Sequence, residues 1–310
     1  MTTQLFIFAQ TARVQVIHNS ADAAAAEVDI YLNGTIAIPE LNYMEATPFV
    51  DLPADAEITL DIVPSGMDIA SSVYNVSTTL MSGESYILVA DGIVSGSGYD
   101  PAPAFNVEIY AGAREMASDM MNTDVLVHHG STDAPTVDVY EQGGTLLADD
   151  LMFTDFAGYL ELPTNDYYLQ LRDETGMTTL LAYDAPLASL ELDGAAITVI
   201  ASGFLNPANN MDGQAFGLYA VTAAGGAFLP LETSMAKVQV IHNSADALAS
   251  TVDVYLNDEI LLPDFAYMTA TPYVDVPAGV ELSIDIAPGN SMDASESIYN
   301  LTAPLMADET

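Results

Sequence analysis

Val14-Gln-Val-Ile-His-Asn-Ser-Ala-Asp22 returns almost letter for letter as Val238-Gln-Val-Ile-His-Asn-Ser-Ala-Asp246. A weaker version, Val125-Leu-Val-His-His-Gly-Ser-Thr-Asp133, lies between them. A spacing of about a hundred residues is the size of a whole domain rather than of a short structural repeat. The sequence therefore predicts three serial copies of one folding unit.

Further blocks recur in the same order and place copy 1 at residues 12–112, copy 2 at 124–223 and copy 3 at 236–310, after an apolar segment at 1–11. Copy 1 continues through Tyr86-Ile-Leu-Val-Ala90 and Phe105-Asn-Val-Glu-Ile-Tyr110. Copy 2 has counterparts of both segments, whereas the sequence of copy 3 stops at Thr310 before reaching them. Copy 3 is thus expected to lack its C-terminal strands.

Acidic residues dominate the charge, with 44 Asp and Glu against 4 Lys and Arg and a formal net charge of −40. This charge disfavours nucleic acid and anionic membranes as partners. Two explanations stay open: adaptation to high salt, or divalent cations, above all Ca²⁺, held at carboxylate-lined loops. No other cofactor is indicated. Cysteine is absent, and no stretch approaches the roughly 20 apolar residues of a membrane span.

Apolar residues alternate with polar ones in most segments, as in Val14, Val16 and His18. This period of two predicts half-buried strands. The segment Tyr86–Ala90 is apolar on both faces and is expected to be a central strand. About seven short strands per copy predict an all-β protein of tandem antiparallel β-sandwiches. Helix is expected only around Ala23–Ala26 and in the linker Ala113–Met121.

Four blocks together resemble the family of domain of unknown function 4397. They are Ala12-Arg-Val-Gln-Val-Ile-His-Asn-Ser-Ala-Asp22, Val28-Asp-Ile-Tyr31, Ala46-Thr-Pro-Phe-Val-Asp-Leu-Pro53 and Ser85-Tyr-Ile-Leu-Val-Ala90. The resemblance implies immunoglobulin-like sandwiches in exported bacterial or archaeal surface proteins, and hence an extracellular or cell-surface location. It implies no known catalytic residue.

The recurring His-x-Ser-x-Asp pattern supplies the residue types of a hydrolytic triad. However, residues two apart on a strand are roughly 7 Å apart along its axis, whereas a nucleophile and its base must approach within about 3 Å. We therefore interpret the pattern as structural, with the imidazole at the end of the core and the Ser and Asp holding the next turn, and we predict no enzyme. A metal or ligand site is the alternative; its residues would be His18, Asp22, His129, Asp133, His242 and Asp246.

A second candidate site is a row of tyrosines with neighbouring aspartates, expected on the outward face of the sheet: Tyr31, Tyr140 and Tyr255 beside Asp29, Asp138 and Asp253. Such a row would suit carbohydrate, although rows of this kind are more often a half-buried sheet surface or a domain interface. Loop acids offer further Ca²⁺ candidates, without the spacing of a known calcium motif: Asp91, Asp100, Asp212 and Asp293.

The segment Leu5, Phe6, Ile7, Phe8 and Ala9 is either the remnant of a leader or a spare strand. Three explanations fit an incomplete copy 3: a fragment of a longer protein, disorder, or a strand supplied by another chain. In the last case the spare segment of one chain would complete copy 3 of the next, and the contact would propagate head to tail into a fibre.

Two functions are therefore expected from the sequence. The first is an extracellular structural or surface protein whose partners are copies of itself or other surface components. The alternative is an adhesive module that binds carbohydrate or protein and is stabilised by calcium.

Overall fold

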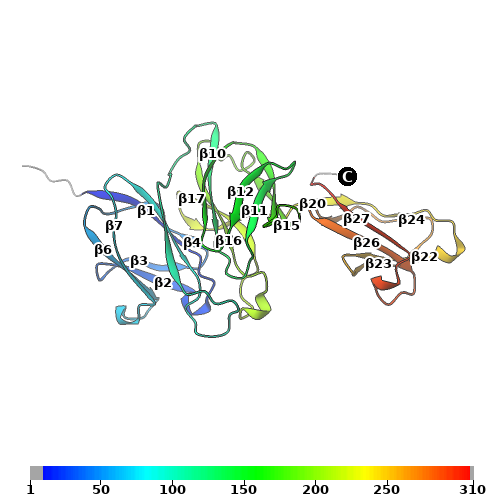
Figure 1. Ribbon diagram of the computed structural model, residues 1–310, viewed down its shortest axis with the longest axis horizontal. Coiled ribbons are helices and arrows are strands. Elements are labelled where there is room, and N and C mark those ends of the chain that lie inside the picture. Colours follow the sequence, from blue (N-terminus) through cyan, green and yellow to red (C-terminus); the bar gives the residue numbers. More distant parts are fainter. Residues whose placement is uncertain (1–9, 308–310) are drawn as a thin grey trace, which may run out of the picture. The chain divides into compact units, whose positions relative to one another are not determined.

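The computed structural model describes residues 10–307, and these residues form an all-β protein (Figure 1), which confirms the predicted fold class. The predicted donor strand Leu5–Ala9 lies outside the described residues. Helical structure in the described part consists of one-turn 3₁₀ segments: η1 (Ala23–Ala25), η2 (Ile69–Ser71), η3 (Pro207–Asn209), η4 (Ala247–Ala249) and η5 (Ala294–Glu296). Packing divides the chain into two units. The first runs to Thr136 and includes 148–166 and 186–231; the second comprises 137–147, 167–185 and the chain from Glu232.

Copy 1 is a sandwich of two sheets. The first has the order β18-β4-β1-β8-β9, with β5 also paired to β1, and the second has the order β3-β2-β6-β7. The strands of the first are β1 (Thr11–His18), β4 (Glu45–Ala46), β5 (Val50–Pro53), β8 (Ser85–Asp91), β9 (Asn106–Ala111) and β18 (Gly226–Ala227). Those of the second are β2 (Glu27–Leu32), β3 (Thr35–Asn42), β6 (Glu57–Pro64) and β7 (Tyr74–Thr79).

One pairing in copy 1 is parallel, although the strands were expected to be antiparallel throughout. β1 runs parallel to β8 from Arg13 opposite Ser85 to His18 opposite Ala90. Its other edge pairs antiparallel with β4 and β5. A parallel pair needs a long crossover connection, and here the intervening chain supplies it by forming the second sheet. The predicted central position of Tyr86–Ala90 follows, since β8 lies between β1 and β9.

The alternation along β1 and β8 separates two apolar cores. Val14 and Val16 face the core of the sandwich together with Leu88. The intervening residues, including Ile17, belong to a second core that copy 1 shares with the first sheet of copy 2. That shared core contains Ile17, Ala46, Phe49, Ile87 and Val89 from copy 1, Leu126, Ile200, Tyr219 and Val221 from copy 2, and Ala113 and Phe228 from the segments that follow copy 1 and copy 2. The first sheet of copy 1 is therefore buried on both faces.

Copy 2 repeats the strand orders of copy 1. Its first sheet has the order β13-β10-β16-β17-β19, and its second has the order β12-β11-β14-β15. β10 again runs parallel to β16, with Val125 opposite Ile197 and His129 opposite Ala201. The strands are β10 (Asn122–His129), β11 (Val137–Glu141), β12 (Leu146–Leu151), β13 (Phe156–Pro163), β14 (Asp166–Asp173), β15 (Thr179–Pro186), β16 (Ala196–Ser202), β17 (Gly217–Thr222) and β19 (Leu229–Pro230).

Copy 3 contains a four-stranded sheet, β23-β22-β26-β27, and two strand pairs, β20-β25 and β21-β24. The pairs correspond to the β1-β5 and β1-β4 pairings of copy 1. Among the described residues, β20 and β21 have no partner on their other edge. The strands are β20 (Met235–Val238), β21 (Ile241–His242), β22 (Thr251–Leu256), β23 (Glu259–Ala266), β24 (Thr269–Ala270), β25 (Val274–Pro277), β26 (Glu281–Pro288) and β27 (Tyr299–Pro304).

The expectation of helix in the linker Ala113–Met121 was wrong, whereas η1 occupies Ala23–Ala25 as predicted. Tertiary hydrogen bonds hold the linker in an irregular path. The Ser118 amide donates to the buried Asp124 carboxylate at 2.7 Å, and the Ala117 amide donates to the Gly194 carbonyl at 2.8 Å. These bonds replace the local ones that a helix would have used.

The shared core predicts that Leu126, which is fully buried, stabilises both copies at once. Leu126→Ala should lower the free energy of unfolding by about 2–5 kcal/mol, because it removes buried methyl groups and leaves a cavity. Urea denaturation followed by circular dichroism measures this loss. The control Leu205→Ala, at a side chain 46% exposed, should change stability by less than about 0.5 kcal/mol. Equal effects would contradict the assignment.

Candidate functional site

The His-x-Ser-x-Asp pattern of copy 1 ties the end of β1 to segments distant in sequence. His18 is fully buried, and its Nε2 donates to the Ala25 carbonyl at 2.7 Å. The Ser20 hydroxyl donates to the Gly92 carbonyl, 72 residues further on, at 2.6 Å. Asp22 caps η1 through the Ala24 amide, and its other oxygen accepts hydrogen bonds from two amides of the loop after β8, those of Val94 and Ser95.

Copy 2 makes the same long-range contacts at the same spacing. The Ser131 hydroxyl donates to the Gly203 carbonyl, again 72 residues on, at 2.7 Å. Asp133 accepts hydrogen bonds from the Leu205 and Asn206 amides, both at 2.8 Å. His129 Nε2 lies 3.1 Å from the Pro135 carbonyl. The pattern is therefore a clamp that fastens the first strand to the loop after its parallel partner.

Within the described residues, copy 3 makes the local half of this clamp. His242 Nε2 donates to the Ala249 carbonyl at 2.7 Å, and Asp246 caps η4 through the Leu248 amide at 2.9 Å. Ser244 and Asp246 are exposed, whereas their counterparts in copy 1 are fully buried. In none of the three copies does the serine hydroxyl bond the histidine of its motif, although the Ser244 amide lies 3.3 Å from His242 Nδ1. The histidine and aspartate side chains of all three copies, and the serine hydroxyls of copies 1 and 2, bond backbone. The geometry supports the structural interpretation.

Burial disfavours the protonated form of His18 and His129. It lowers the pKa of His18 and of His129 below the ordinary value of 6.5. The Nδ1 atom of each ring has no hydrogen-bond partner among the described residues, so a proton placed there would be buried without an acceptor. Burial raises the pKa of Asp22, but hydrogen bonds from the Ala24 and Ser95 amides outweigh it and lower that pKa overall.

A buried polar cluster that the sequence did not reveal lies where copy 1 meets the first sheet of copy 2. His128 Nε2 lies 2.7 Å from an Asp91 oxygen, and both side chains are almost fully buried. His128 Nδ1 faces the Asp155 carbonyl at 3.1 Å. Both ring nitrogens of His128 therefore face oxygen acceptors, one from a carboxylate and one from a backbone carbonyl.

Asn19 completes this cluster by donating to the other Asp91 oxygen at 2.6 Å and to the Gly130 carbonyl at 3.0 Å. A Cβ on Gly130 would lie 2.1 Å from the Asn19 amide nitrogen, so a larger residue does not fit there. The cluster fixes how the two copies meet. Its sequence signals are two departures of copy 2 from the repeat: His128 stands where copies 1 and 3 have isoleucine, and Gly130 where they have asparagine.

The tyrosine row is not an exposed platform. Tyr255 is 4% exposed and its hydroxyl bonds Ser291 at 2.9 Å. Tyr31 and Tyr140 are half-buried, and the Arg172 guanidinium stacks 4.1 Å from the Tyr140 ring centre.

The neighbouring aspartates Asp29, Asp138 and Asp253 are buried. They face away from the apolar core, as alternation requires, but the following hairpin covers them. Asp29 accepts from the Glu40 amide and Asp253 from the Asp264 amide. Glu40 and Asp264 have φ near +50° at irregularities in these hairpins, so the buried carboxylates hold backbone that is otherwise strained.

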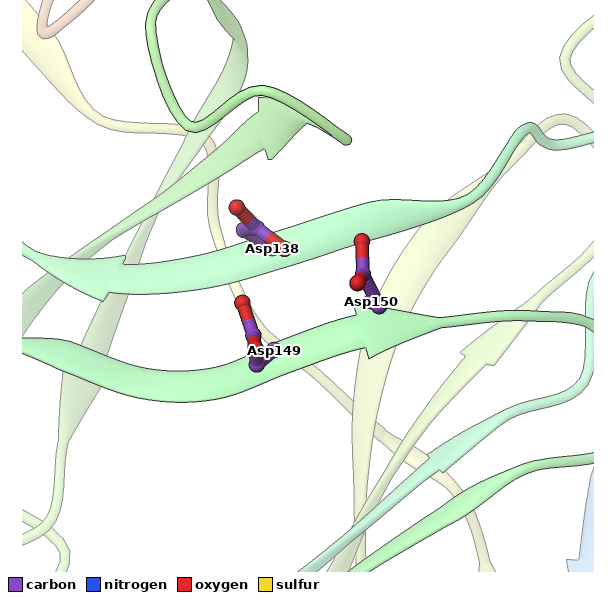
Figure 2. Close-up of side chains that lie close together, drawn as sticks. All are labelled: Asp138, Asp149 and Asp150. Carbon is purple, nitrogen blue, oxygen red and sulfur yellow. The ribbon is translucent and has the colours of Figure 1, made fainter.

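The loop acids proposed for Ca²⁺ do not come together. Asp91 is in the buried cluster, Asp293 caps η5, and the Asp100 amide binds the side chain of Asn210. Asp212 has φ near +51° in the turn after η3. Among the described residues, one set of three acidic side chains brings its possible metal-ligand atoms within 4.8 Å of one another. It consists of Asp138 on β11 with Asp149 and Asp150 on β12 (Figure 2). Since the equivalent aspartates of copies 1 and 3 accept backbone amides, this group follows from the hairpin architecture.

All four basic side chains of the chain lie within the described residues, and each has a protein partner. Arg13 bonds Glu115 through two nitrogens, Arg114 bridges Asp124 and Glu161, and Lys237 bonds Asp275. Arg172 stacks on Tyr140 and donates to Gln170. The described part therefore offers no group of free cations to a polyanion. It also contains no helix long and apolar enough to cross a membrane.

The open edge of copy 3 is the remaining candidate. We define the acceptor groove as the two cavities beside β20 and β21, both of which reach Ile241. One has a volume of about 330 Å³ and is lined mainly by apolar side chains, among them Val240, Val254 and Ile286. The other, of about 740 Å³, runs along Ala236 to Gln239. In copy 1 the corresponding space is filled by Leu88 and Ala90 of β8 and Val107 of β9.

Comparison with known proteins places the chain in a family. A family model described as domain of unknown function (DUF4397) matches residues 123–224 and 236–309, more than half of the chain, so the protein belongs to this family. No curated protein matches. A solved structure entitled "The Bacillus anthracis TIE protein" aligns with 96% of this chain at 8% identity and a TM-score of 0.20, which is too low to indicate a shared fold. The chain spans 48% of that protein.

The clamp histidines should make stability depend on pH. The fold favours their neutral form, so their contribution is complete above the ordinary pKa of 6.5 and is lost as pH falls below it. Histidine C2-proton NMR should show His18 and His129 still neutral at pH 6, and urea denaturation should show a falling unfolding free energy between pH 7 and 5. Titration of both rings near 6.5 in the folded protein would contradict this.

The clamp aspartates offer an internal comparison. Asp22→Ala removes the cap of η1 and also leaves the Val94 and Ser95 amides unpaired, whereas Asp246→Ala removes only the cap of η4. Asp22→Ala should therefore cost about 1–3 kcal/mol more in unfolding free energy. Thermal melts of both variants, with hydrogen exchange at Val94 and Ser95, measure the difference. Equal costs would show that the long-range half of the clamp contributes nothing.

Proposed function

We propose that this DUF4397 protein is an extracellular structural or surface protein whose chains assemble head to tail by strand donation. The observation that carries the proposal is the acceptor groove. Its edge on β20 and β21 has no pairing partner within residues 10–307, and its smaller cavity is lined mainly by apolar side chains. An unpaired strand edge beside an apolar pocket is the surface to which an added strand binds.

The remaining features fit a structural role. Tandem sandwiches suit an extended surface protein, and the clamp motifs stabilise the fold rather than expose reactive groups. The net charge of −40 favours solubility of separate chains, so an assembly contact needs a specific apolar site. Salt should strengthen that contact by screening repulsion between chains.

The alternative is an adhesive module for carbohydrate or another surface protein, stabilised by calcium. It has less support, because Tyr255 is buried and the other two tyrosines of the row are half-buried. A carbohydrate platform requires exposed ring faces. We therefore place strand donation first.

Deletion of residues 1–9 tests the proposal while leaving β1, which begins at Thr11, intact. The parent chain should sediment as oligomers whose size grows with protein concentration and with salt, and should form ordered polymers on negatively stained grids. The shortened chain should be a monomer with an unchanged melting temperature. A parent that stays monomeric at every concentration, or a shortened chain that assembles as the parent does, would refute strand donation.

A further inference from the structure

The methionines of copies 1 and 2 lie on the surface of the protein instead of in its cores. Residues 10–231 contain nine methionines, and none of them is buried. Met44 is half-buried beside the shared core. Eight others, which we call the surface methionines, are 55–85% exposed: Met67, Met81, Met116, Met120, Met121, Met152, Met177 and Met211. This distribution is unusual, because the flexible methionine side chain is commonly used to fill gaps in cores.

Packing does not explain these positions. The surface methionines lie outside the strands, in turns and connecting segments, where an exposed apolar side chain gains no burial. The cores are built mainly from valine, isoleucine, leucine and alanine. Methionine is therefore placed where its hydrophobicity contributes least to stability. The property that distinguishes it there from a leucine is the polarizable sulfur of its thioether.

The surface methionines also do not gather into one docking patch. Met67 follows β6, and Met81 follows β7. Because β6 and β7 are antiparallel neighbours, these two residues lie at opposite ends of the second sheet of copy 1. A protein-binding surface would bring its apolar side chains together on one face. Their separation instead suits a reaction with small molecules in solution.

Several other side chains that oxidants attack are absent or buried. Cysteine, the second sulfur-containing residue on which oxidants act, does not occur in the chain, and neither does tryptophan. The four histidines are buried. A dissolved oxidant that reaches copies 1 and 2 therefore meets exposed thioethers.

We propose that the surface methionines are sacrificial reductants that consume hypochlorous acid. In each reaction the thioether sulfur loses two electrons and forms a bond to one oxygen, giving a sulfoxide. The oxygen–chlorine bond of the acid breaks, its chlorine leaves as chloride, and its proton is released to water. No further reactant is needed. A sulfoxide is polar, so it would disrupt a core but is solvated in an exposed loop, and the fold survives the reaction.

Peptide mass spectrometry after stepwise addition of hypochlorous acid to the full chain tests the order of reaction. The surface methionines should gain oxygen first, and Met44 should react about tenfold more slowly because it packs against the shared core. Once all surface methionines are sulfoxides, the melting temperature should have fallen by less than about 5 °C. Unfolding before they have reacted, or reaction of Met44 at their rate, would overturn the proposal.

A buried methionine provides the matched control. Leu126 is fully buried in the shared core, and Leu126→Met nearly conserves its volume. Both this variant and its reference chain carry Met44→Leu, are oxidised in urea and are then diluted to refold. The reference should recover its folded signal as the unoxidised chain does, whereas Leu126→Met should recover less than about a tenth, because its sulfoxide is polar and buried. Equal recovery would contradict the explanation for keeping methionine out of the cores.

Replacing all eight surface methionines by leucine tests the consumption itself. Parent or variant is mixed with a thiol enzyme that hypochlorous acid inactivates, and the acid is titrated in. The variant should take up about eight fewer equivalents per chain before the enzyme loses activity, one for each thioether removed. Two variants that each replace four of the eight should each lose half of this capacity, and they keep the test decisive if the full variant does not fold. Equal protection by parent and variants would overturn the proposal.

Discussion

The parallel pairing of the first strand with the strand 72 residues further on determines how a copy closes. The strands of the second sheet lie between β1 and β8 in the sequence. The sandwich is therefore complete only when β8 pairs with the edge of β1. Such a contact is costly in chain entropy. The Ser20 and Asp22 side chains reinforce it at the point where β1 ends, and Ser131 and Asp133 do the same in copy 2.

Part of the acidity has a structural purpose. Asp22, Asp133 and Asp253 accept backbone amides that would otherwise be unpaired. A carboxylate can accept several hydrogen bonds at once, and bonds to an ionised acceptor are stronger than neutral ones. The negative charge of this protein is therefore not limited to solvated surface carboxylates, because some of its carboxylates hold loops and turns in place.

The sequence predicted the strands well because alternation is a local property. The pattern through Val14, Val16 and His18 correctly put the imidazole at the end of the core, and the two-faced segment Tyr86–Ala90 became a central strand. The sequence could not predict the direction of strand pairing, since β1 pairs parallel with β8 at one edge and antiparallel with β4 and β5 at the other. Burial of Asp29 was also missed, because alternation distinguishes the two faces of a sheet but does not show what covers the second face.

The candidate site was likewise predictable from the sequence only in part. The local half of the clamp, in which Asp22 caps the next turn, could be predicted from the residue types. The long-range half needed the partner of β1, which one sequence does not give. The pairing of Asp91 with His128 depends on contact between two copies, and no pattern within one copy indicates it.

The register of the first sheet has a mechanical consequence. Val14 lies opposite Tyr86, and Tyr86 lies opposite Ala111. The chain therefore enters and leaves copy 1 at the same end of the sheet, about 10 Å apart across two strand spacings. Tension along the chain would peel these strands apart one bond at a time instead of shearing many bonds together. Resistance to a pulling force would then depend on the shared core around Leu126 and Phe228. The side chains of this core must slide past one another before either sandwich can open.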